Sequence, residues 1–146
     1  MEYFIRHLNR IRRCLNIYRG EMLKGKELAG CHVPYVLKIC RTPGILQDQL
    51  AKEFYVNKSN VARHLAALEK NNYIYRTPKE NDRRTLQVFP TEQAMEILPL
   101  VSQTTQEWKA TVLEDLSEEE RAMFMRILKQ VADKAVTLAE SGWENI

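Results

Sequence analysis

Apolar residues recur at three- and four-residue steps near both ends of the chain. Near the N-terminus this spacing predicts a long amphipathic helix that ends near Met22, with an apolar face made by Phe4, Ile5, Leu8, Ile11, Leu15 and Tyr18. Near the C-terminus, Ser117 and Glu120 form a capping box that predicts the start of a second long helix. Its inward-facing residues are Met123, Phe124, Ile127, Leu128, Val131, Ala135 and Leu138.

Two short helices are predicted after the first long one. The earlier one begins at about Val33, with Pro34 in its first turn, where a missing N–H costs nothing. It stops at residues 41–44, whose Pro-Gly pair is a strong helix breaker. The later one runs from about Leu46 to Phe54.

A third short helix, over residues 57–72, has signals at its start, along its length and at its end. Asn57 is suited to accept hydrogen bonds from the first-turn N–H groups. A stripe at i, i+4 and i+7 is formed by Val61, Leu65 and Leu68. Asn71 and Asn72 end the helix, because asparagine is the usual second choice after glycine for a left-handed residue.

Two β-like runs follow, at residues 73–76 and 85–89, separated by the polar sequence TPKENDRR. Thr91 then opens a helix that extends to about Leu116. Two short helices followed by a basic hairpin are the order of a winged helix-turn-helix. We therefore expect a mainly α fold in which an α/β winged helix-turn-helix is flanked by N- and C-terminal helices. A winged helix does not need these outer helices, so they predict a partner surface.

Composition narrows the class of protein. With 146 residues and 45% hydrophobic content the chain can bury a core, and no apolar run approaches the roughly 20 residues that a membrane span requires. The N-terminus has no uninterrupted apolar h-region, so we expect no signal peptide, no membrane partner and a cytoplasmic protein. The net charge of +3 is small, but residues 58–84 carry +4 while residues 114–120 include five acids. This polarity suits a molecule with one DNA-facing side.

The residues opposite the apolar stripe of the 57–72 helix are short, polar or basic. In a helix-turn-helix, the early residues of the recognition helix meet base edges. Arg63 is suited to pair with guanine and Asn60 with adenine, while Ser59 suits phosphate. In the wing, over residues 73–90, Asp82 is expected to pair with a neighbouring arginine, so that Arg83 or Arg84 can enter a minor groove. The expected DNA-binding set is Asn57, Lys58, Ser59, Asn60, Arg63, His64, Asp82, Arg83 and Arg84.

The sequence carries little that points to catalysis or to metal binding. The sequence contains no glycine-rich phosphate loop, HExxH or GxSxG motif, so we expect no enzyme. The three histidines are scattered in sequence and no second histidine pair has helical spacing, so we expect no metal site or other cofactor. The three cysteines form no CxxC, and free buried thiols are the expected state. His32 and Tyr35 are expected to line an effector pocket with Cys14, or to contribute to packing.

The run VNKSNVARHLAALEKNNYIYRTPKENDRRTLQVFPT resembles the MarR family of bacterial transcription regulators. The resemblance rests on the Arg63 position, on residues 68–70 (LEK) and on residues 82–84 (DRR). It implies a homodimer that is built by the N- and C-terminal helices and binds a pseudo-palindromic operator. It also implies release by a small ligand or by cysteine oxidation. The chain departs from the family pattern at four places. The family has Ser or Thr at Leu46, glycine at Tyr55 and Asn72, and Leu-Thr where this chain has Phe89-Pro90-Thr91.

These observations lead to one functional hypothesis and one alternative. We expect a dimeric DNA-binding regulator, a repressor, in which residues 1–30 and 92–146 form dimerisation helices and residues 31–91 form the DNA-binding region of one intertwined domain. The alternative is a winged-helix module for protein contacts, or an activator without a ligand response. The basic wing favours DNA as the partner.

Overall fold

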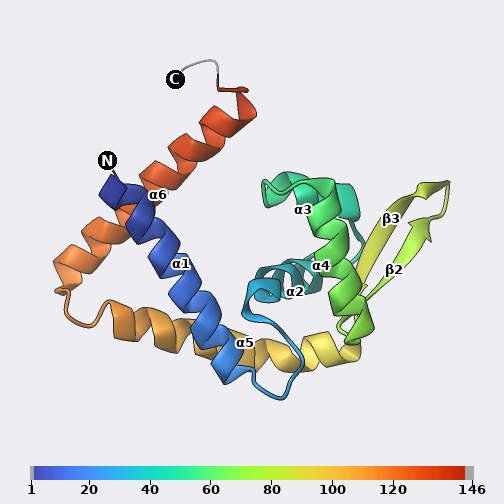
Figure 1. The fold of residues 1–146 in the computed structure, drawn as a ribbon, viewed down its shortest axis with the longest axis horizontal. Helices are drawn as coiled ribbons and strands as arrows, with labels where there is room; N and C mark the ends of the chain where they lie inside the picture. The colour runs from blue at the N-terminus through green and yellow to red at the C-terminus, as the bar shows by residue number, and fades with distance from the viewer. Residues whose placement is uncertain (1, 144–146) are drawn as a thin grey trace. The chain divides into compact units, whose positions relative to one another are not determined.

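The computed structural model describes residues 2–143. These residues form two compact units that divide between Trp108 and Lys109. The elements occur in the order α1 (Glu2–Met22), η1 (Gly30–His32), α2 (Val33–Arg41), β1 (Ile45–Leu46), α3 (Gln47–Glu53), α4 (Lys58–Lys70), β2 (Ile74–Lys79), β3 (Asp82–Pro90), α5 (Glu92–Val112) and α6 (Glu118–Glu140) (Figure 1). The protein is mainly helical with one small antiparallel sheet, as the sequence predicts.

The core of the first unit lies where α2, α3, α4 and the sheet meet. Its fully buried side chains are apolar and come from each of these elements, with the stripe of α4 at its centre: Val33, Val36, Ile39, Leu50, Val61, Leu65, Leu68 and Val88. Burial of a side chain of this kind contributes about 1.5–3 kcal/mol. The three-residue stripe therefore fixes which face of α4 points inward and which faces solvent.

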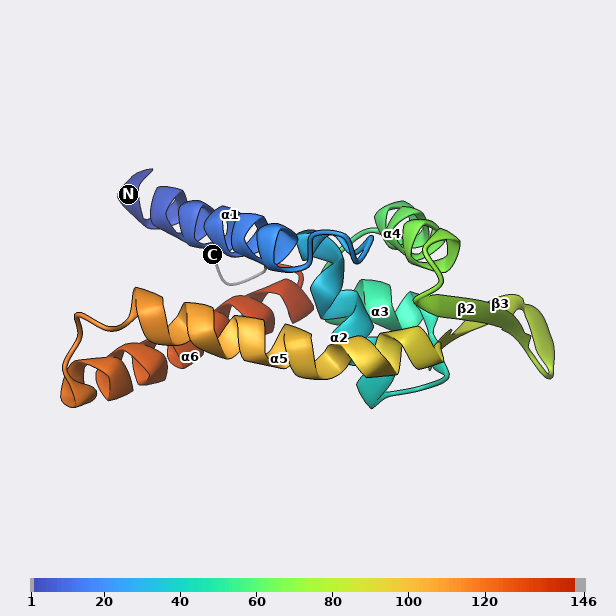
Figure 2. The same cartoon turned by 90° about the horizontal axis from the view of Figure 1, so that it is seen from below.

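The three strands pair in the order β1-β3-β2. β2 and β3 form a hairpin that extends away from the helices of this unit (Figures 1 and 2). Both strands are longer than the sequence predicts, so only Glu80 and Asn81 remain between them. The very short β1 was not predicted. It pairs Ile45 with Val88 and Leu46 with Gln87.

The turns around α3 and α4 take the geometry that glycine would give. Tyr55 and Asn72 have φ angles of 52° and 62°, which lie in the left-handed region. Asn72 thus acts as the left-handed terminal residue that the sequence predicts. Leu46 cannot cap α3 with its side chain, but its N–H donates to Gln49 Oε1 at 3.0 Å.

Within the first unit, α1 is held against its neighbours near its C-terminal end. Gly30 packs so closely on α1 that a Cβ there would lie 2.1 Å from the carbonyl oxygen of Asn16. The buried Arg19 donates to Thr105 of α5 at 3.4 Å, and burial lowers the pKa of its guanidinium. The N-terminal half of α1 exposes its apolar residues, which include Tyr3, Phe4, Ile5, Leu8 and Ile11.

The second unit consists of the end of α5, a turn and α6. The predicted capping box is present: Ser117 Oγ accepts from the N–H of Glu120, whose carboxylate accepts from the N–H of Ser117. Arg121 donates to three carbonyl groups of the turn, those of Leu113, Glu114 and Leu116. No residue of α6 is buried, and its exposed apolar residues include Met123, Phe124, Ile127, Leu128 and Val131.

Candidate nucleic-acid interface

The N-terminus of α4 is fixed by its cap. Asn57 has extended backbone angles, and its Oδ1 accepts from the Asn60 N–H and from the Ser59 hydroxyl, each at 2.8 Å. The cap thus satisfies one otherwise unpaired first-turn N–H group. Asn57 and Ser59 are therefore engaged with each other in the free protein.

We predict that Asn57→Ala destabilises the protein by about 1 kcal/mol, because the first turn of α4 loses its acceptor. Urea unfolding at fixed protein concentration measures this as a lower midpoint with an unchanged slope. Asn57→Asp is the matched control, since aspartate caps as well as asparagine does. Equal midpoints for Asn57→Ala and the wild type would contradict the capping role.

The solvent-facing side of α4 carries the polar residues that the sequence singles out. Lys58, Ser59 and Arg63 are exposed and Asn60 is half-buried, while the apolar stripe of the same helix is fully buried. Arg63 donates to Oδ1 of Asn60 through a short hydrogen bond. These two side chains therefore form one coupled group on the helix surface.

Lys58 has a partner that the sequence does not reveal. Its ammonium lies 3.2 Å from Oδ2 of Asp48 in α3, and both side chains are exposed. An exposed ion pair of this kind stabilises by about 0–1 kcal/mol. Lys58 is consequently available to a stronger anionic partner.

Arg76 is the residue whose role sequence reasoning missed. It lies in the basic segment 58–84, yet its guanidinium donates to Glu69 of α4 at 3.2 Å and to Gln47 of α3 at 3.3 Å. The hydrogen bonds from Arg76 lower the pKa of Glu69. The Arg76 side chain therefore ties β2 to α3 and α4 and sets where the hairpin begins.

The tip of the hairpin is organised by Asp82, although not through an arginine side chain as the sequence predicts. Its carboxylate accepts from the Thr85 hydroxyl at 2.6 Å and from the Arg84 backbone N–H at 3.1 Å. These two hydrogen bonds, the one from Thr85 foremost, lower the pKa of Asp82. Arg83 and Arg84 are both exposed, so the tip presents two guanidinium groups to solvent.

His64 differs from the other polar residues of α4, because its side chain contacts His32 and Tyr35 at the start of α2. Its Nδ1 lies 3.0 Å from Nε2 of His32, and its ring lies 5.2 Å from that of Tyr35. Burial lowers the pKa of both histidines, with further contributions from His64 on His32 and from Arg63 on His64. Two of the histidines that are scattered in sequence are thus adjacent in space.

Of the predicted effector-pocket residues, His32 and Tyr35 both contact the His64 ring. Cys14 is exposed on α1. Cys31 is also exposed, so only Cys40 matches the expectation of buried thiols. Burial, followed by the nearby Cys31, raises the pKa of the Tyr35 hydroxyl.

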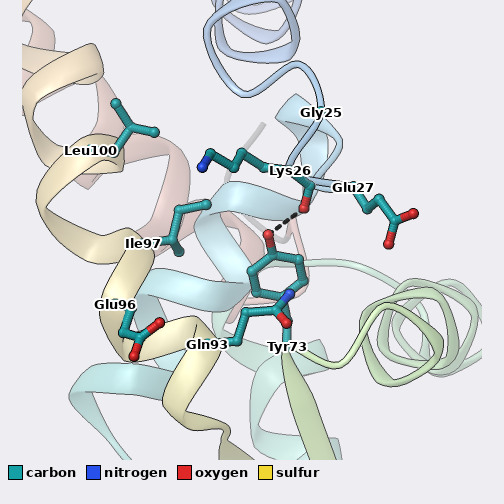
Figure 3. A pocket seen from close by; sticks show the side chains of 8 residues that line it. All are labelled: Gly25, Lys26, Glu27, Tyr73, Gln93, Glu96, Ile97 and Leu100. Atoms are coloured by element: carbon teal, nitrogen blue, oxygen red, sulfur yellow. Dashed lines mark hydrogen bonds between the residues drawn. The ribbon is translucent and has the colours of Figure 1, made fainter.

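A pocket of about 530 Å³ lies elsewhere in the first unit (Figure 3). It is lined by the turn after α1, by Tyr73 and by one face of α5: Gly25, Lys26, Glu27, Tyr73, Gln93, Glu96, Ile97 and Leu100. The Tyr73 hydroxyl donates to the carbonyl group of Lys26, which holds the turn over the pocket. The volume is in the range of small-molecule sites.

Three comparisons place this geometry among known proteins. The model of the MarR family matches residues 35–86, from α2 into β3. The HTH-type transcriptional regulator YybA of Bacillus subtilis (strain 168) is 25% identical over 146 residues, which are 100% of this chain and 95% of that protein. The chain also resembles the crystal structure of MarR, with 32% identity, a TM-score of 0.85 and coverage of 92% of this chain and 91% of that one.

A further solved structure is similar along almost the full length. It is a putative MarR family transcriptional regulator from Listeria monocytogenes, complexed with a 26mer DNA, with 25% identity, a TM-score of 0.80 and 97% coverage of both chains. Within residues 2–143, no helix combines the length and apolar character needed to cross a membrane. The family model and the likeness to MarR over 92% of this chain agree with the winged helix-turn-helix that α3, α4 and the β2–β3 hairpin build. The chain belongs to the MarR family of DNA-binding transcription regulators.

Proposed function

We propose that the protein is a homodimeric repressor that binds a pseudo-palindromic operator. In each subunit α4 enters the major groove, and the β2–β3 hairpin, the wing, lies along the adjacent minor groove. The residues proposed to contact DNA are Asn57, Lys58, Ser59, Asn60, Arg63, Asp82, Arg83 and Arg84, with Asn57 and Asp82 acting by positioning their neighbours. His64 is left out of this set because its ring packs against α2.

The observation that carries the proposal is the division of α4 into two faces. Its apolar stripe is buried, so the helix cannot rotate, and the opposite side presents Asn60 and Arg63 to solvent. Arg83 and Arg84 are exposed at the tip of the hairpin that follows. An exposed polar helix followed by a basic hairpin supports base reading by the helix and backbone binding by the wing.

The homodimer is proposed from the apolar residues that each unit leaves exposed. The exposed large apolar residues of α1 in the first unit and of α6 in the second have 38–70% of their surface exposed. They include Tyr3, Ile11, Phe124 and Leu128. Soluble proteins rarely expose apolar residues in such numbers along a helix. We therefore assign residues 1–30 and 92–146 to dimerisation, with residues 31–91 as the DNA-binding region.

Release of the operator is part of the proposal. The 530 Å³ pocket beside α5 supports a small effector, because it lies between an element assigned to dimerisation and Tyr73, the first residue of the wing. Binding there would favour a dimer whose two α4 helices are wrongly spaced for successive major grooves. Oxidation of the exposed Cys14 is the second proposed route.

Binding to promoter DNA tests the proposal. Fluorescence anisotropy with DNA from upstream of the protein's own gene should give specific binding at least about 10³-fold tighter than binding to unrelated DNA. Footprinting should show two half-sites separated by about one helical turn. No difference between specific and unrelated DNA would favour the winged-helix module for protein contacts. Reporter transcription that falls when the protein is removed would indicate an activator.

We predict that Arg84→Ala weakens binding both to the operator and to unrelated DNA. In each subunit, it should lower the slope of log K against log salt by about one unit for every phosphate that the wing no longer neutralises. The decrease in affinity should be larger when the flanking DNA is A·T-rich, since a narrow minor groove attracts arginine. Asp82→Ala should have a smaller effect, because it loosens the tip without removing a positive charge. Equal salt slopes with no dependence on flanking sequence would show the wing to be a solvated turn.

A further inference from the structure

Three metal-ligating side chains from two distant parts of the chain meet beside α2. Cys31 and His32 belong to η1, and His64 comes from the middle of α4. One ligand atom from each, the Cys31 thiol sulfur and one ring nitrogen of each histidine, all lie within 4.8 Å of one another. Cys31 is exposed and both histidines are half-buried, so an ion can reach the cluster from solvent.

The spacing is close to that of a zinc site. With Zn–N bonds of about 2.0–2.1 Å and Zn–S bonds of about 2.3 Å, tetrahedral ligand atoms lie roughly 3.3–3.6 Å apart. His32 Nε2 and His64 Nδ1 are 3.0 Å apart, and the sulfur lies within 4.8 Å of one ring nitrogen of each histidine. Rotation of the exposed Cys31 side chain is the main adjustment required. A hydrogen bond between the two rings accounts for their contact, but it does not account for a thiol beside them.

The chemistry of the three ligands selects the ion. One thiolate and two imidazoles suit a borderline or soft metal, whereas Mg²⁺ and Ca²⁺ prefer oxygen ligands. We propose that Cys31, His32 and His64 bind one Zn²⁺ ion per chain, with a fourth position open to water. The ion joins the start of α2 to α4 one residue beyond Arg63.

Proton movements on binding are simple. In the metal-free pair, one imidazole donates the hydrogen of the 3.0 Å hydrogen bond. Coordination requires a lone pair on both facing nitrogens, so this proton moves to the other nitrogen of the donor ring. The thiol releases its proton to solvent, because the thiolate is the ligand. Zinc binding therefore releases one proton per site, without any oxidation or reduction.

Titration of the full-length, reduced protein with Co²⁺ tests the site directly, because Co²⁺ substitutes for Zn²⁺ and is coloured. We expect one Co²⁺ per chain, a thiolate-to-cobalt charge-transfer band and the visible spectrum of a tetrahedral ion, all abolished by one equivalent of Zn²⁺ and unaffected by Mg²⁺. Cys31→Ser should remove the charge-transfer band. His32→Gln and His64→Gln should each weaken binding by more than about tenfold, the lower end of the loss seen when even an outer-shell partner is removed.

Matched controls separate this site from unspecific binding. Cys14→Ser changes another exposed cysteine, and His7→Gln changes the remaining histidine, so both should bind Co²⁺ as the wild type does. A wild-type protein without a charge-transfer band, or a band that survives Cys31→Ser, would overturn the proposal. So would equally weakened binding in the control variants. No readout involves DNA, so this result is independent of the proposed operator binding.

Discussion

Arg63→Ala is expected to weaken operator binding by roughly 1–3 kcal/mol per half-site and to relax specificity at one base position. Arg63 is exposed on the face of α4 opposite the buried stripe, where a bidentate contact to a guanine edge is possible. A single symmetric operator contains two such contacts, so the effect on the dimer is among the largest that one substitution can have. Anisotropy titrations against operators changed at each base pair measure both the affinity and the base preference.

Two matched variants define what Arg63 does. Arg63→Lys keeps the charge but loses the bidentate geometry, and should lose specificity while retaining most of the salt-dependent affinity. Lys70→Ala removes an exposed charge at the far end of the same helix and should change affinity little. Because Arg63 donates to Asn60, a double-mutant cycle with Asn60→Ala should show coupling between the two. Unchanged affinity of Arg63→Ala for every sequence would show that α4 is not the recognition helix.

Leu128→Glu is expected to convert the proposed dimer to monomers and to reduce operator binding to the level of unrelated DNA. An obligate dimer buries more than about 2,000 Å² in total, and a carboxylate within such an apolar surface is left without a partner. A monomer contacts only one half-site of the operator and therefore loses most of the specific affinity, on the order of 10³-fold or more. Sedimentation velocity at micromolar concentration measures the assembly, and anisotropy measures the binding.

The control for this substitution lies on the same helix. Ala122→Glu adds the same charge to an exposed position on the face of α6 opposite Phe124, Leu128 and Val131, and should remain dimeric. Far-UV circular dichroism should show that both variants keep their helices, since α6 contributes no buried residue to the isolated chain. A wild-type protein that sediments as a monomer would rule out the proposed assembly. A dimeric Leu128→Glu would place the interface elsewhere.

Local sequence signals were sufficient wherever a structure is set by residues close in the chain. The stripe of Val61, Leu65 and Leu68 predicted both the existence and the orientation of α4, because a helix repeats every 3.6 residues and has one buried face. Asn57 and the Ser117 capping box were predicted for the same reason, since a cap involves atoms only three residues apart. The hairpin was predicted but its strands were too short, because an exposed wing has no buried face to mark where pairing ends.

The sequence by itself determined the order of the α-helices and the hairpin, the winged helix-turn-helix and the polar face of α4, which are encoded in periodicity and turn chemistry. Only the tertiary structure decided which side chains meet across the chain. In the folded chain, Arg76 links the hairpin to α4, His64 contacts His32, and Cys14 and Cys31 are exposed. The physical reason is that a contact such as that between His32 and His64, 32 residues apart, depends on how the helices pack. Hydrophobic spacing specifies the buried face of each helix, but it does not specify which polar neighbours that packing brings together.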